Sequence, residues 1–146
     1  TQASLSEEQL SWFKEKLKEE YTPGKPIFVF LHQAIFTDFF GQDWHGVRQG
    51  DEFTDILKDY PEVIIFSSHD HKDFGDDSIH ENMPYTMAYT GAVGYTLFRD
   101  EDNDGELKGN YSYNNALYVE VKDNVVTLNQ RDVKDHKWIN SKEISK

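Results

Sequence analysis

The sequence contains no cysteine, which excludes disulfide bonds and thiolate chemistry and leaves the compartment open between cytoplasmic and secreted. No apolar run approaches the ~20 residues of a membrane-spanning helix, and the first residues are polar, unlike a signal peptide. Basic patches are also missing: 15 Lys and Arg stand against 27 Asp and Glu, a formal net charge of −12. We therefore expect no nucleic-acid partner and no membrane partner.

A chain of 146 residues can bury one hydrophobic core, and we expect a single domain over residues 1–146. Two continuous apolar segments, residues 26–31 and 63–66, indicate buried strands. Between them, four apolar residues recur at helical spacing: Phe53, Ile56, Leu57 and Tyr60. Strand, helix and strand predict a parallel pair joined by a right-handed crossover.

The remaining patterns place this unit in an α/β (α+β) fold. A helix over residues 6–17 is predicted, capped by Ser4 or Ser6. The later chain alternates as strands do, over residues 85–89, 94–98, 112–121 and 125–129. Asp123 and Asn124 are typical of a hairpin turn between the last two strands. A βαβ unit followed by mainly antiparallel strands predicts a layered sandwich.

Three histidines follow the two predicted parallel strands. His32 ends the first apolar segment, and His69 and His71 follow the second. The carboxyl ends of parallel strands meet at one sheet edge, so these histidines are expected to converge there. Residues two apart on an extended backbone point the same way, which predicts that His69 and His71 face one point. Neutral imidazoles bind zinc, iron and similar ions, and the alternative is two solvated histidines in a polar loop.

The segments 25–34 (KPIFVFLHQA) and 63–71 (VIIFSSHDH) resemble the last two conserved blocks of calcineurin-like metallophosphoesterases, closest to the purple-acid-phosphatase-like and bacterial phosphohydrolase branches. The helix over residues 6–17 is similar to the helix that precedes these blocks, and residues 88–95 to the start of the closing sheet. The resemblance implies the carboxyl-terminal half of a four-layer α/β/β/α sandwich.

The resemblance also implies roles for the three histidines. His32 and His69 would bind one metal of a dinuclear Mn, Fe or Zn centre, and His71 would bind the other. The earlier blocks of the family, Asp-x-His, Gly-Asp-x-x-Asp and Gly-Asn-His-Asp/Glu, do not precede the segment 25–34 in this sequence. Ser68 stands where the family usually has glycine, and a left-handed serine there would cost about 1–2 kcal/mol.

The expected function is therefore a metal-dependent phosphoester hydrolase, a phosphatase or a phosphodiesterase acting on a small phosphorylated substrate. The longer parent protein would carry the activity, and this chain alone would be inactive because it supplies three metal ligands and no catalytic proton donor. The alternative is a non-catalytic domain that keeps the fold and binds a ligand or partner. A strand of the first parallel pair would be left with an unpaired edge, which predicts a homodimer through residues 27–31 or through the strands after Met83.

Other polar residues carry weaker signals. His45 and Arg48 follow the first histidine in an aromatic-rich segment and could contact a phosphate, with a surface position as the alternative. His80 is interpreted as a surface or core residue in a loop. Residues 100–105 (DEDNDG) imitate the start of a calcium loop, but position twelve is Tyr111 instead of a glutamate, so an acidic turn is expected.

Overall fold

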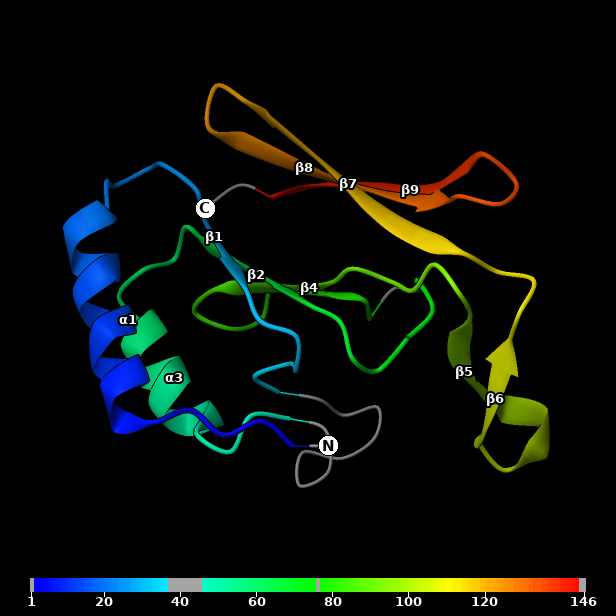
Figure 1. The fold of residues 1–146 in the computed structure, drawn as a ribbon. Coiled ribbons are helices and arrows are strands. Elements are labelled where there is room, and N and C mark those ends of the chain that lie inside the picture. The colour runs from blue at the N-terminus through cyan, green and yellow to red at the C-terminus, as the bar shows by residue number, and fades with distance from the viewer. Residues whose placement is uncertain (1, 37–45, 76, 145–146) are drawn as a thin grey trace.

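The computed structural model describes residues 2–36, 46–75 and 77–144. Three layers make up the main body: two helices, a mixed four-stranded sheet and a three-stranded antiparallel sheet (Figure 1). A separate two-stranded hairpin projects from the end of the mixed sheet that lies away from the helices (Figure 1). The predicted α+β class is confirmed at this level.

Two predicted helices cover one face of the mixed sheet. Helix α1 (Glu7–Glu20) begins at Ser6, whose hydroxyl accepts a hydrogen bond from the Gln9 amide, while the Gln9 side chain accepts one from the Ser6 amide. This reciprocal capping satisfies two amides that the helix itself leaves unpaired. Helix α3 (Gly50–Leu57) buries Phe53 and Leu57 against the sheet.

The mixed sheet has the strand order β1-β2-β4-β3. Strands β1 (Ile27–Phe30) and β2 (Val63–Ser67) are parallel and joined through α3, as predicted. Strand β4 (Thr86–Tyr89) is also parallel to β2, and the two-residue β3 (Ile79–His80) pairs antiparallel with β4. His80 therefore lies in a strand, and its expected position in a loop is wrong.

The outer sheet consists of β7 (Asn115–Lys122), β8 (Val125–Asp132) and β9 (Lys137–Ile144). Asp123 and Asn124 link the first two strands with φ of 51° and 65°, which is the backbone of the predicted hairpin turn. The sequence does not predict strand β9, because its residues, KWINSKEI, show no clear alternation of apolar and polar side chains. Pairing with β8 along its whole length holds it in place.

The projecting hairpin is formed by β5 (Thr96–Asp100) and β6 (Glu106–Asn110), joined by the short helix η1 (Glu101–Asn103). The predicted acidic turn is this connection: the Asp100 side chain caps η1 and forms an ion pair with Lys108 at 2.5 Å. Lys108 thus neutralises the Asp100 carboxylate, which occupies position one of the sequence that imitates a calcium loop. Strand β6 itself was not predicted.

The mixed sheet has a separate core on each face. All five residues of β2 are buried: Val63 and Ile65 face the helices, while Ile64 and Phe66 face the outer sheet beside Val126 and Leu128. Each such side chain contributes about 1.5–3 kcal/mol through burial. The continuous apolar pattern of β2 follows from this position between two layers.

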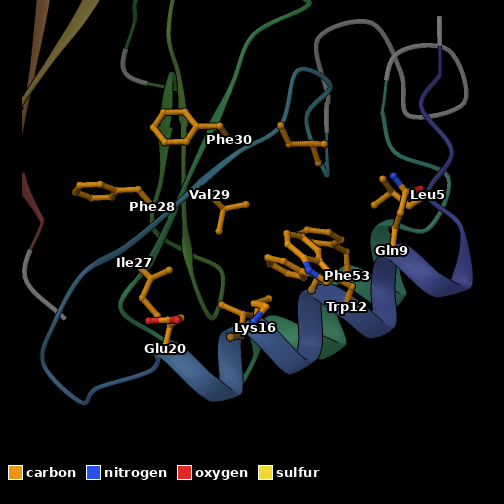
Figure 2. Close-up of a pocket in the computed structure, with 13 residues that line it drawn as sticks. Leu5, Gln9, Trp12, Lys16, Glu20, Ile27, Phe28, Val29, Phe30 and Phe53 are labelled. Atoms are coloured by element: carbon orange, nitrogen blue, oxygen red, sulfur yellow. The ribbon is translucent and has the colours of Figure 1, made fainter.

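Strand β1, in contrast, lies at the end of the mixed sheet, and its outer side pairs with no strand of the described chain. Ile27 and Val29 point toward α1, whereas Phe28 and Phe30 point to the other side of the strand (Figure 2). Phe30 is 76% exposed. Between α1 and β1 lies an apolar groove of about 480 Å³ that Trp12 borders. Within residues 2–36, 46–75 and 77–144, the outer edge of β1 is thus unpaired, as expected.

Candidate metal centre

His32 and His69, 37 positions apart in sequence, are brought together at the carboxyl ends of β1 and β2. The Nε2 atom of His32 lies 3.2 Å from the Nδ1 atom of His69, and the ring centroids are 5.0 Å apart at an interplanar angle of 71°. The parallel register of the two strands pairs Phe30 with Phe66. The last residue of β1 is therefore level with the last but one residue of β2. A histidine follows each strand at the same edge of the sheet.

This nitrogen–nitrogen distance suits two arrangements. Two neutral imidazoles can share a hydrogen bond of 3.2 Å, one ring donating its N–H to the other. Two imidazoles bound to one tetrahedral ion at about 2.0–2.1 Å would have their nitrogens about 3.3–3.4 Å apart. Only a small adjustment converts the first arrangement into the second. Both nitrogens would then present lone pairs to the ion, with each proton on the opposite ring nitrogen.

The backbone at His69 is not extended, contrary to the expectation. Strand β2 ends at Ser67, and His69 has φ of 63°. The Asp70 amide donates a 2.7 Å hydrogen bond to the Ser68 carbonyl, which closes a γ-turn around His69. This conformation costs a residue with a side chain about 1–2 kcal/mol. The strain falls on His69 itself, whereas Ser68 has a negative φ and is free of the penalty considered for it.

The His71 ring packs on Tyr95, whereas the His32 and His69 rings pack on each other. His71 also has a positive φ, 51°, so the extended backbone on which the expected common direction of His69 and His71 depended is absent. The Leu97 amide donates a 2.7 Å hydrogen bond to the His71 carbonyl, and the His71 ring packs on Tyr95 with centroids 4.5 Å apart. Its Nδ1 atom is buried and has no hydrogen-bond partner within the described part of the chain. Among residues 2–36, 46–75 and 77–144, no group of three or more His, Asp or Glu is arranged to hold a metal ion.

The remaining candidate residues of the sequence have other positions. His45 lies outside the described residues, as do the aromatic residues Phe39, Phe40 and Trp44. The Arg48 side chain donates to Gln2 at 2.8 Å, and its amide donates to the Ala3 carbonyl at 2.9 Å. Arg48 therefore holds the segment before α1 against the segment before α3. His80 pairs with Met87, and its ring lies 6.0 Å from that of Tyr89.

Near this edge Lys72 is buried and Asp73 is partly buried, which the sequence did not predict. Lys72 is 6% exposed, and its ammonium lies 2.5 Å from an Asp77 carboxylate oxygen and 5.4 Å from the Tyr89 ring centroid. Asp73 accepts hydrogen bonds from the Asn115 side chain at 2.6 Å and from the Phe74 amide at 2.8 Å. Burial raises the pKa of Asp73, although these two hydrogen bonds lower it in part. Polar residues in a loop gave no sequence signal of such burial.

A groove includes His71 in its lining. The groove has a volume of about 490 Å³ and is lined by Ser68, His71, the loop of residues 90–94 and the start of β7. None of its lining side chains is charged.

None of the helices in the described ranges is long and apolar enough to cross a membrane. No protein-family model and no curated protein matches this chain.

Proposed function

We propose that this chain supplies metal ligands to a dinuclear centre that hydrolyses phosphoesters, as the carboxyl-terminal half of a calcineurin-like metallophosphoesterase. The 3.2 Å distance between His32 Nε2 and His69 Nδ1 carries the proposal, because one ion needs two imidazole nitrogens at about that separation. The succession of a helical layer, a mixed sheet and a second sheet supports it, since a four-layer sandwich contains the same three layers.

The residues present fit a metal ion in part. His32 and His69 would hold one Zn, Mn or Fe ion, ions for which imidazole is a suitable ligand. Two imidazoles leave further coordination positions for water, for substrate oxygens and for ligands from the rest of a longer protein. His71 is proposed for a second ion, and its packing on Tyr95 fixes the orientation of its ring.

The chemistry assigned to this chain is to bind and orient. Two divalent ions, when bound, supply a hydroxide nucleophile and neutralise the phosphoryl oxygens. His32 and His69 serve as neutral ligands and transfer no proton in this scheme. The main-chain hydrogen bond from Ser68 to the His32 carbonyl and the γ-turn at His69 keep both imidazoles at the shared position. Positive charge from the ions offsets the net charge of −12 that would otherwise repel a phosphorylated substrate.

Isothermal titration with zinc tests the metal site directly. The wild-type chain is compared with His32→Ala/His69→Ala and with His136→Ala, a histidine in the turn before β9. We expect the double variant to bind zinc more than about tenfold more weakly, because even partners that only orient metal ligands are worth about that much. The His136→Ala control should bind as the wild type does. Equal affinity in all three proteins would overturn the assignment.

A non-catalytic binding domain is the second candidate. The observation that favours it is the absence, within the described residues, of a third ligand near His32 and His69. A longer polypeptide that contains this chain and the missing blocks distinguishes the two functions. Manganese-dependent hydrolysis of 4-nitrophenyl phosphate that is lost in His69→Ala supports the enzyme. Metal binding without hydrolysis in that polypeptide supports the binding domain.

A further inference from the structure

The free edge of β1 has its hydrogen-bonding groups at Phe28 and Phe30. On the other side of the strand, the amides of Ile27 and Leu31 donate to carbonyls of β2. The N–H and C=O groups of residues two apart along a strand point to the same side, so Val29 also faces β2. The N–H and C=O groups of Phe28 and Phe30 therefore point away from β2. In the described part of the chain, no strand pairs with them.

The apolar groove of about 480 Å³ lies against the same strand. Ile27 and Val29 line it from β1, and Trp12 and Lys16 line it from α1 (Figure 2). The Trp12 side chain is 60% exposed. A strand added to the free edge of β1 would point every second side chain toward the helices, and so into this groove. The free edge and the groove are thus two parts of one surface that suits a strand.

We propose that β1 of a second copy of the chain covers this surface, paired antiparallel about a twofold axis at Val29. In this register Phe28 of each copy lies opposite Phe30 of the other, and each such pair exchanges both of its main-chain hydrogen bonds. An axis at Phe28 would place Phe30 opposite Pro26, which has no amide to donate. An axis at Phe30 would place Phe28 opposite His32, which lies beyond the end of β1. The inference does not depend on the proposed metal chemistry.

The same register covers apolar side chains on both faces of the strand. On the helix side, Val29 of one copy meets Val29 of the other, and Ile27 meets Leu31, so that these side chains fill the two grooves. On the opposite face, each Phe28 ring lies beside a Phe30 ring, which is 76% exposed in the single chain. Cross-strand aromatic pairs of this kind stabilise antiparallel strands.

The charge of this surface suits a second copy. Strand β1 contains no charged residue, and the α1 side of the groove carries one cation, Lys16, and one anion, Glu20. The whole chain, in contrast, has a formal net charge of −12. In a twofold dimer each copy meets the same surface of the other, so a surface of one sign would repel its copy. Two acidic chains can therefore approach each other at β1, where the surface is neutral.

Disulfide cross-linking tests the register, because the chain contains no cysteine and each introduced thiol is the only one. Two copies of Val29→Cys place their Cα atoms about 4.5 Å apart, within the range of a disulfide. Two copies of Phe28→Cys place theirs about 8–9 Å apart, beyond that range. In a glutathione redox buffer we expect a linked dimer of Val29→Cys only. Val121→Cys, at a half-exposed position of β7, is the control for random collision. Equal linking in all three variants, or a Val29→Cys protein that stays unlinked, would overturn the proposal.

Substitution of Trp12 tests the groove. Trp12→Ala should weaken the dimer by about tenfold or more, as removal of one aromatic side chain at the centre of an interface commonly does. Trp138→Ala is the matched control, because Trp138 is 58% exposed and lies on β9, outside the groove. Sedimentation equilibrium over a range of concentrations gives the dissociation constants of both variants. A Trp12→Ala dimer as stable as that of the wild type would overturn the assignment of the groove to the second copy.

Discussion

The main-chain amide of Ser68 donates a 3.0 Å hydrogen bond to the main-chain carbonyl of His32. This bond joins the loops that follow β1 and β2, at the first residue of the γ-turn around His69. The two proposed metal ligands are therefore connected through the backbone as well as through their rings. Side chains placed by backbone contacts of this kind need little rearrangement to receive an ion.

Substitutions at the γ-turn should have opposite effects at neighbouring positions. His69→Gly is expected to leave stability unchanged or to raise it by up to about 1 kcal/mol, because glycine adopts positive φ without strain. Ser68→Gly is expected to lower stability by about 0.5–1 kcal/mol. Because Ser68 has a negative φ, glycine relieves no strain there and only raises the conformational entropy of the unfolded chain. Urea unfolding measures both. A stabilising Ser68→Gly would show that the strain lies at Ser68 instead.

Gly91 should tolerate no side chain. Its φ is 74°, and a Cβ atom would lie 2.5 Å from the Asn115 Cβ and 2.9 Å from Cζ of Phe74. Gly91→Ala is expected to destabilise the fold by about 2–4 kcal/mol through strain and overpacking. Gly94→Ala is the matched control in the same loop, because an added Cβ there meets no atom within 4 Å. Thermal unfolding of both variants checks the difference, and equal melting temperatures would contradict it.

Glu62 should make stability depend on pH in the acid range. Burial alone would raise the pKa of its carboxyl group, but hydrogen bonds from the Gly24 amide, from its own amide and from Tyr21 outweigh burial, and the pKa is lowered below its ordinary 4.5. A carboxyl group whose pKa is lower in the folded state stabilises the fold above its unfolded pKa. That stabilisation is lost as the pH falls through the folded pKa.

Glu62→Gln removes this dependence while keeping an oxygen that can accept from Gly24. We expect the variant to be about 1 kcal/mol less stable than the wild type at pH 7, the scale of one hydrogen bond to a charged group near the surface. The difference should shrink as the pH is lowered from 7 to 3. Unfolding curves at both values provide the measurement, and a difference that grows toward pH 3 would reverse the assigned sign.

The chain by itself should show negligible phosphoesterase activity with manganese, zinc or iron. The physical reason is that two converging imidazoles cannot hold two ions at the spacing that phosphoryl transfer requires. Release of nitrophenolate from 4-nitrophenyl phosphate at millimolar metal measures it. Robust turnover that disappears in His69→Ala would show that the chain contains a complete centre.

A second copy of the chain is the partner expected at the free edge of β1. The strand carries no charged residue between Ile27 and Phe30, although charges commonly protect such edges. Because β1 is apolar on both sides, it is itself a suitable strand to pair with another β1 about a twofold axis. The opposite edge of the sheet, β3, is only two residues long and offers little pairing.

Sedimentation equilibrium at micromolar concentration should therefore show a dimer of the wild type. Phe30→Lys should shift it to monomer, because a charge would be buried at the pairing edge. Val121→Lys, at a half-exposed apolar position of β7, is the control and should remain dimeric. A monomeric wild type whose β1 amides are protected from hydrogen exchange would reject this interface.

The sequence alone determined the elements whose pattern is local. Ser6 and Gln9 specify where α1 begins, since both capping hydrogen bonds join residues three apart. The continuous apolar run of β2 and the helical spacing of α3 predict the parallel pair, because a strand covered on both faces has no polar side. From that pair, the meeting of His32 with His69 follows by topology.

The tertiary structure decided what depends on distant contacts. The left-handed backbone of His69 and His71 sends one ring to His32 and the other to Tyr95, and no local pattern encodes that choice. Pairing with neighbours creates β6 and β9, whose own sequences alternate poorly. Secondary structure follows from periodicity within one segment. The direction of a side chain after a strand ends is instead set by hydrogen bonds and packing partners far away in the sequence.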